Sequence, residues 1–308
     1  MTGRRQHYAH FYGLQPIPQD DRPLLVVHGN CQAESLRVLL GSSSSQSSGI
    51  DDAPVRTVRL PPVHELTAED LPHLERVLAR VDVLVSQPVR DGYRDLPLGT
   101  AEVLARAARR PRSVVVPIVR WAALHPFQVI VRSPGAGEPP VVPYSDLRAL
   151  SLAAGRPALP DVPSADAVRA VRDLSVRELE GRQERHGSLP VVDLLQAAGA
   201  AATHTVNHPG NGVLTGLAGR VLAALGLPAD VADPGRTLLD SVHAPVLPEV
   251  LAALGLEPAA ARAEWRVSGS PLADEEVRAA QLRWYAEHPG VAEAGLARHA
   301  EAAAALAP

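Results

Sequence analysis

A polar segment that carries the sole cysteine follows the first apolar run of the sequence. The run at 24–27 predicts a buried parallel strand, and a helix is expected from 33 to 40. Free N–H groups and the helix dipole at the start of a helix favour a thiolate, or hold an oxyanion or phosphate. This turn is therefore expected to hold a nucleophile or an anion, with an inert buried thiol as the alternative. Its residues are His28, Gly29, Asn30, Cys31 and Gln32.

A second polar segment, THTVNHPGN at 203–211, precedes a predicted helix at 211–225. Its His208 is a candidate general base, because imidazole titrates near working pH. Many enzymes activate a cysteine thiol with a neighbouring histidine that acts as its base. Asn207 is a further polar candidate beside it. The alternative interpretation of 207–209 is an ordinary turn and helix cap.

Polar residues also follow two other predicted strands. Gln87 comes after the strand expected at 81–86 and offers both a hydrogen-bond donor and an acceptor. Tyr93 and Arg94 follow it, and Arg94 is suited to clamping a phosphate. His125 comes after the strand expected at 113–119. Plain polar loops remain the alternative for these segments.

Alternating strands and helices predict an α/β fold. Besides the strands named above, one is expected at 55–60, with helices at 67–80 and 99–109 between strands. The prediction is a parallel-sheet core of SGNH or flavodoxin-like type in the N-terminal part and a mainly α-helical C-terminal half. Ligands of such sheets bind beyond the carboxyl ends of the strands, where the polar segments lie. The later helices are expected at 145–154, 164–184, 190–198, 211–225, 246–254, 274–286 and 291–306.

Four segments are expected along the chain. They are an N-terminal extension (1–23), an α/β core with the cysteine (24–143), a helical part that completes the site (144–228) and a C-terminal helical region (229–308). The serine-rich stretch at 42–52 is expected to be a loop.

Composition narrows the class of protein. The 308 residues include 46% hydrophobic residues, enough for a real core, and carry a net charge of -4, which disfavours nucleic-acid binding. One cysteine excludes an intrachain disulfide framework. With no signal core and no apolar run long enough for a membrane span, a cytoplasmic protein is expected.

Several cofactor motifs are absent from the sequence. It has no GxGxxG after the first strand, no P-loop and no GxSxG elbow, which argues against dinucleotide, P-loop and serine-hydrolase sites. The neutral imidazoles of His28, His125, His204 and His208 could bind zinc, but no obvious carboxylate completes the set, so no metal is expected.

Taken together, these segments resemble the WcbI family of polysaccharide-biosynthesis acetyltransferases. The resemblance covers roughly 24–226, about two thirds of the chain, and is specific through the order of its motifs. Two departures occur: 119–122 reads VRWA where the family often has a Phe or Tyr pair, and Ser145 stands where relatives often have His. The motifs are GNCQ (29–32), QP (87–88), GYR (92–94), LGT (98–100), HP (125–126), YSD (144–146), LEGR (179–182) and NHP (207–209).

The resemblance implies an enzyme that binds coenzyme A and moves an acetyl or related acyl group to a sugar hydroxyl, in capsule or other polysaccharide synthesis. The expected partners are an acyl-CoA donor and a sugar or glycosylated small-molecule acceptor. Cys31 is expected to be the reactive thiol and His208 its base. Whether the thiol forms an acyl-enzyme or only positions the groups for direct transfer stays open. The expected crevice and cofactor-binding residues are Gly29, Asn30, Gln32, Gln87, Tyr93, Arg94, His125 and Asn207.

Two other functions stay open at this point. A thiol esterase or hydrolase on the same sheet type would use water in place of the sugar. A non-catalytic protein would hold a nucleotide-like or glycan ligand in the crevice and dock a partner through its helical C-terminal region. Product analysis and the effect of removing the Cys31 thiol would separate these functions.

Overall fold

The computed structural model describes residues 3–42, 53–133 and 135–308. The predicted serine-rich loop therefore lies mostly outside the described residues. The chain forms two compact units, each assembled from several segments. Unit 1 comprises 1–118, 180–194 and 211–238, and unit 2 comprises 119–179, 195–210 and 239–308. The four segments predicted along the sequence are each continuous, whereas the two compact units are not. The division into four segments therefore stays a prediction.

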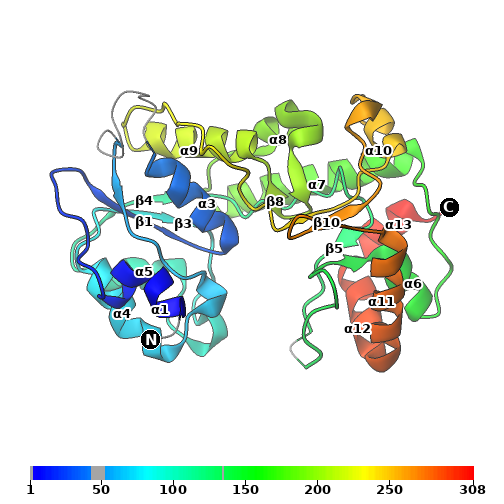
Figure 1. Ribbon diagram of the computed structural model, residues 1–308, viewed down its shortest axis with the longest axis horizontal. Coiled ribbons are helices and arrows are strands. Elements are labelled where there is room, and N and C mark those ends of the chain that lie inside the picture. The colour runs from blue at the N-terminus through cyan, green and yellow to red at the C-terminus, as the bar shows by residue number, and fades with distance from the viewer. Residues whose placement is uncertain (1–2, 43–52, 134) are drawn as a thin grey trace. The chain divides into compact units, whose positions relative to one another are not determined.

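A four-stranded parallel sheet forms the centre of unit 1 (Figure 1). Its order, β2-β1-β3-β4, is that of the first four strands of a flavodoxin-like sheet, in which the strand order reverses between β1 and β3. The predicted α/β class is therefore confirmed. The strands are β1 (Leu24–His28), β2 (Arg56–Thr57), β3 (Val83–Ser86) and β4 (Arg112–Val115).

Prolines shorten two strands relative to their predicted lengths. The strand expected at 55–60 pairs only over β2, and Pro61 and Pro62 follow Leu60. The strand expected at 113–119 pairs only through Val115, two residues before Pro117. Proline has no N–H to donate to a sheet, so pairing stops near it.

Helices and an apolar core surround the strands of unit 1. Every residue of β1 and β3 is buried, as parallel strands covered on both faces require. Phe11, Leu24, Leu84 and Leu98 belong to one buried apolar cluster. The helices are α1 (Gly3–His7), α2 (Ala9–Tyr12), α3 (Cys31–Leu40), α4 (Leu71–Leu78), α5 (Thr100–Arg106) and α9 (Asn211–Ala224), while α7 (Ala165–His186) and α8 (Val192–Ala198) contribute to both units.

Unit 2 combines helices with short antiparallel strands that the sequence did not reveal. Two or three paired residues are too few to show an alternating pattern. The strand pairs are β5 (Gln128–Val129) with β6 (Ser145–Asp146) and β7 (Thr203–Thr205) with β8 (His208–Pro209), and β9 (Val242–His243), β10 (Trp265–Val267) and β11 (Ser270–Leu272) form a third sheet.

The helices of unit 2 pack around a second core that contains Phe127, Leu147 and Tyr285. The final helix expected at 291–306 is two helices that meet at His299, whose backbone is not helical. None of the described helices is long and apolar enough to cross a membrane. The helices are α6 (Leu147–Ala153), α10 (Pro248–Ala253), α11 (Asp274–Glu287), α12 (Pro289–Arg298) and α13 (Ala300–Leu306).

Candidate functional site

Cys31 is the first residue of α3, directly beyond the carboxyl end of β1. Asn30 is the N-cap, and its side-chain oxygen accepts a hydrogen bond from the Gln32 backbone N–H at 2.9 Å. Cys31 is half-buried and forms no disulfide. The sequence thus placed the cysteine correctly, at the start of a ten-residue helix.

The side-chain amide of Gln87 fixes this turn from the neighbouring strand. Its Oε1 accepts the Asn30 backbone N–H at 2.8 Å, and its Nε2 donates to Gln32 Oε1 at 3.1 Å. Both glutamines are almost fully buried. A Cβ atom on Gly29 would overlap the Gln87 side chain, so the close approach requires glycine here. Gly29, Asn30, Gln32 and Gln87, four of the predicted residues, therefore form one hydrogen-bonded group beside Cys31.

Thr100 and Glu102 hold the loop that follows Gln87, although neither is among the predicted site residues. The Thr100 hydroxyl donates to the Gln87 carbonyl at 3.0 Å and accepts from the Val89 N–H at 3.0 Å. Glu102 Oε2 accepts the N–H groups of Gly92 and Gly99. The LGT motif therefore has a structural role, because Thr100 in this motif closes the loop after β3.

Tyr93 and Arg94 lie in this loop, in the short 3-10 helix Tyr93–Asp95, but no hydrogen bond among the described residues joins them to the Gln87 group. Tyr93 packs against the core of unit 1. Arg94 is exposed, has a left-handed backbone with φ 56°, and forms no ion pair within the described part of the chain. Its guanidinium is therefore available to an anionic ligand.

His28 is a structural histidine. Its Nε2 lies 2.8 Å from the Leu98 carbonyl, and burial lowers its pKa. It lies in unit 1, whereas His125, His204 and His208 lie in unit 2. Within the described ranges, no group of three or more His, Cys, Asp and Glu side chains is arranged to hold a metal ion.

The hairpin β7–β8 brings two predicted residues of unit 2, Asn207 and His208, beside Tyr144. The Tyr144 hydroxyl donates to Asn207 Oδ1 at 2.8 Å and accepts from Thr205 Oγ1 at 2.9 Å. The Tyr144 ring meets the His208 ring edge to face at 6.2 Å. His208 belongs to strand β8 and not to a turn, and Asn207 lies in the connection before it. The YSD and NHP motifs are thereby brought into contact.

Burial keeps three histidines of unit 2 neutral. It lowers the pKa of His125, His204 and His208 to about 4 in each case. The His204 ring also lies 4.2 Å from the His243 ring, and the electrostatic interaction between the two rings lowers the pKa of His204 further. Such groups bind protons less readily in the folded state than in the unfolded chain.

The predicted site residues thus form two groups. Gly29, Asn30, Cys31, Gln32, Gln87, Tyr93 and Arg94 belong to unit 1, and His125, Asn207 and His208 belong to unit 2.

The close contact of Gly29 with Gln87 predicts opposite effects for two glycine substitutions. We expect Gly29→Ala to lower the free energy of unfolding by about 1–3 kcal/mol, because it displaces the buried Gln87 amide and leaves polar groups unpaired. Gly181→Ala is the matched control. It lies within α7 with open space at its Cβ position and should raise stability by about 0.5–1 kcal/mol. Urea unfolding measures both; equal effects would contradict the packing argument.

The low pKa of His125 predicts a loss of stability in mild acid. Its folded-state pKa of about 4 lies below its ordinary value of 6.5, so below pH 6.5 the unfolded chain gains the proton first. The contribution of His125 to the free energy of unfolding is therefore complete above pH 6.5 and decreases as the pH falls. The decrease is about 2 kcal/mol between about pH 7 and about pH 5. His125→Asn, which keeps a donor for the Pro245 carbonyl, should flatten the dependence by that amount. The exposed His186→Asn should leave it unchanged, and an unaltered slope in both variants would refute the assignment.

Comparisons with known proteins agree on one family. Residues 24–230 match the family described as polysaccharide biosynthesis enzyme WcbI. A solved structure of WcbI, described as a polysaccharide biosynthesis enzyme in its native form without a disulfide bond between coenzyme A and a cysteine, has the same fold. It matches with a TM-score of 0.74 and 21% identity, over 93% of this chain and 98% of that one. A search of curated proteins gives no match. The resemblance seen in the motifs is confirmed, and the chain belongs to the WcbI family of polysaccharide biosynthesis enzymes.

Proposed function

We propose that this protein is an acyl-CoA-dependent acyltransferase that moves an acetyl or related acyl group to a sugar hydroxyl in polysaccharide or glycosylated-metabolite synthesis. The observation that carries the proposal is Cys31 at the first position of α3, in a turn that Asn30, Gln32 and Gln87 hold rigidly. Membership of a polysaccharide biosynthesis family and the coenzyme A named for the solved relative support it.

The residues of unit 1 fit the donor. A helix N-terminus favours a thiolate and stabilises the oxyanion that forms when a thioester is attacked. Gly29, Asn30, Gln32 and Gln87 shape the turn, and the exposed Arg94 guanidinium suits a phosphate of coenzyme A. Tyr93, His125 and Asn207 stay predicted ligand contacts.

The reaction divides into two steps. Cys31 Sγ attacks the thioester carbonyl and forms a new thioester, while the bond to the coenzyme A sulfur breaks and that sulfur leaves as a thiol after taking a proton. The acceptor hydroxyl oxygen then attacks the acyl group and loses its proton to a base. Cys31 is restored, and the products are an ester and free coenzyme A.

The single cysteine makes the first step directly measurable. On incubation with acetyl-CoA we expect the wild-type protein to gain one acetyl group that hydroxylamine removes, and this group can reside only on Cys31 among thiols. Cys31→Ala should not gain it and should lose transfer to a sugar acceptor. As a control for folding, coenzyme A at a hundred times its Kd should still stabilise Cys31→Ala, by about 2.7 kcal/mol.

Three outcomes would contradict parts of the proposal. Full turnover by Cys31→Ser would exclude a nucleophilic role of the thiol. Acetate as the product with and without sugar acceptors would identify a hydrolase. Binding without any turnover of acyl donors would favour a non-catalytic binding protein.

His208 is the proposed base for the second step. Its pKa of about 4 determines the pH at which its protonation should stop the reaction. We expect His208→Ala to lower kcat by about 10²–10⁴. The acid limb of the wild-type kcat/KM profile should lie near pH 4, because the base is already deprotonated above that value. His186→Ala, at the exposed end of α7, is the control. A loss below about tenfold, or an acid limb near the ordinary histidine value, would assign the base to another group.

A further inference from the structure

A groove between helices α6 and α11 of unit 2 has no role in the function proposed so far. Its empty volume, counted with the open side, is about 480 Å³, and part of its wall is formed by Ala149, Leu152, Ala279 and Leu282. Leu152 is 51% exposed although its side chain is large and apolar. A contiguous apolar surface with polar residues around it is typical of a contact surface.

The exposed apolar surface continues beside the groove. Four large apolar side chains are exposed in the described residues, and Val162, at 49%, is another of them. Val162 follows Asp161, whose Oδ1 accepts a hydrogen bond from Arg278 of α11 at 2.9 Å. Two of the four exposed apolar side chains, Leu152 and Val162, therefore belong to the same region of unit 2.

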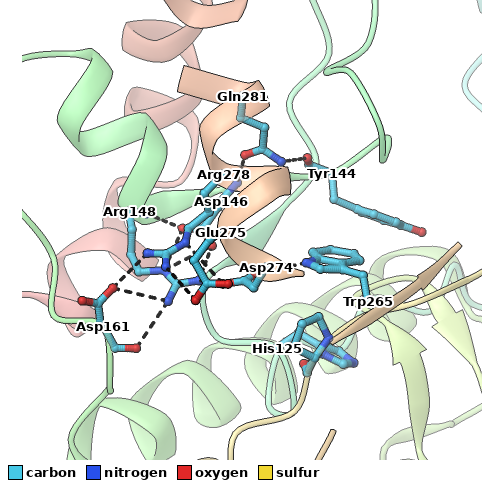
Figure 2. Close-up of polar contacts among 11 residues, drawn as sticks. His125, Tyr144, Asp146, Arg148, Asp161, Trp265, Asp274, Glu275, Arg278 and Gln281 are labelled. Carbon is cyan, nitrogen blue, oxygen red and sulfur yellow. Dashed lines mark hydrogen bonds and ion pairs between the residues drawn. The ribbon is translucent and has the colours of Figure 1, made fainter. Parts of the chain in front are cut away.

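The charges on this surface are unevenly distributed along α11. Near the start of the helix, two guanidinium groups are paired with four carboxylates, which leaves net negative charge there. Figure 2 shows this cluster, which consists of Arg148, Arg278, Asp146, Asp161, Asp274 and Glu275. Further along α11, Arg283 is exposed and forms no ion pair within the described part of the chain. The surface is thus acidic where α11 begins and basic at Arg283.

Three exposed residues of α11 place these charges symmetrically about an alanine. Glu275 lies one turn before Ala279, and Arg283 lies one turn after it. Residues four apart lie on the same side of a helix, so the three form one stripe. The Glu275 side chain is 80% exposed, and its nearest cation, Arg278, is 4.0 Å away, so its carboxylate is accessible to another cation. The small side chain of Ala279 lets a second helix approach closely.

We propose that this surface binds a second copy of the chain about a two-fold axis that passes near Ala279. In a two-fold interface, when residue i of one copy contacts residue j of the other, j also contacts i. Two antiparallel copies of α11 that cross at Ala279 would place Glu275 of each copy opposite Arg283 of the other. The order Glu, Ala, Arg is complementary to itself when reversed, and this favours a second copy as the occupant. The apolar side chains of Leu152 and Leu282 would be covered beside the crossing.

The first test measures the oligomeric state of the full chain by sedimentation velocity. Concentrations from about 1 to about 500 µM cover micromolar and submillimolar Kd values. We expect the wild-type protein to form a dimer in this range. Leu152→Glu should weaken the dimer at least about tenfold, because it places a charge in the apolar part of the contact. Leu14→Glu is the matched control, since Leu14 is an exposed leucine of unit 1, and it should leave the Kd unchanged.

The second test reverses the two charges that are proposed to meet. Arg283→Glu places two carboxylates opposite each other at both ends of the crossing and should raise the Kd at least about tenfold. The double variant Glu275→Arg with Arg283→Glu restores opposite charges and should return the Kd to the wild-type value. Both residues are exposed, so these variants should fold, and thermal unfolding verifies it. If Leu152→Glu does not fold, the charge reversal decides the question.

Three results would overturn the proposal. They are a wild-type protein that stays monomeric at about 500 µM, a dimer whose Kd is unchanged by Leu152→Glu or Arg283→Glu, and a double variant that associates no better than Arg283→Glu alone. Species that grow beyond the dimer with concentration would show head-to-tail contacts and would overturn the two-fold axis. The dimer does not depend on acyl transfer, so each of these results leaves the proposed function as it stands.

Discussion

The turn that carries the cysteine depends on one buried amide. Gln87 accepts a hydrogen bond from the Asn30 backbone and donates one to the Gln32 side chain, so it links the ends of the two central strands. A side-chain amide supplies both a donor and an acceptor without charge. The same contact excludes a Cβ atom on Gly29. The same contact therefore requires both Gln87 after β3 and Gly29 after β1.

The two groups of polar residues differ in how completely they are paired. In unit 1 the side-chain amides of Gln87 and Asn30 are used in holding the turn, which gives a rigid frame for a reactive group. In unit 2, Nε2 of His125 and of Gln128 are buried and unpaired among the described residues. A paired network fixes geometry, whereas a buried polar atom without a partner costs stability. The first group thus suits a reacting centre.

Local signals in the sequence predicted the first group well and the second only in part. The turn at Cys31 follows from a continuous apolar strand and a helix, both of which have clear periodicity. His125 and His208 were found as polar residues near predicted elements, but Gln128 and Trp265 were not. They lie on strands of two or three residues, which are too short for an alternating pattern to show. No periodic pattern can reveal such a pairing, and the orphaned atoms appear only once both partners are placed.

The depressed pKa of His125 also limits the chemistry expected of it. A base with a pKa of about 4 is neutral at physiological pH, so it can always accept a hydrogen bond, but full proton transfer to it is unfavourable. Within a buried pocket that hydrogen bond is stronger than in water. His125 is therefore suited to a hydrogen bond such as the one with the Pro245 carbonyl rather than to general-base chemistry. His208 shares the low pKa, so it can take a proton efficiently only if the bound substrates raise its pKa, as the negative charge that develops on an attacked thioester would do.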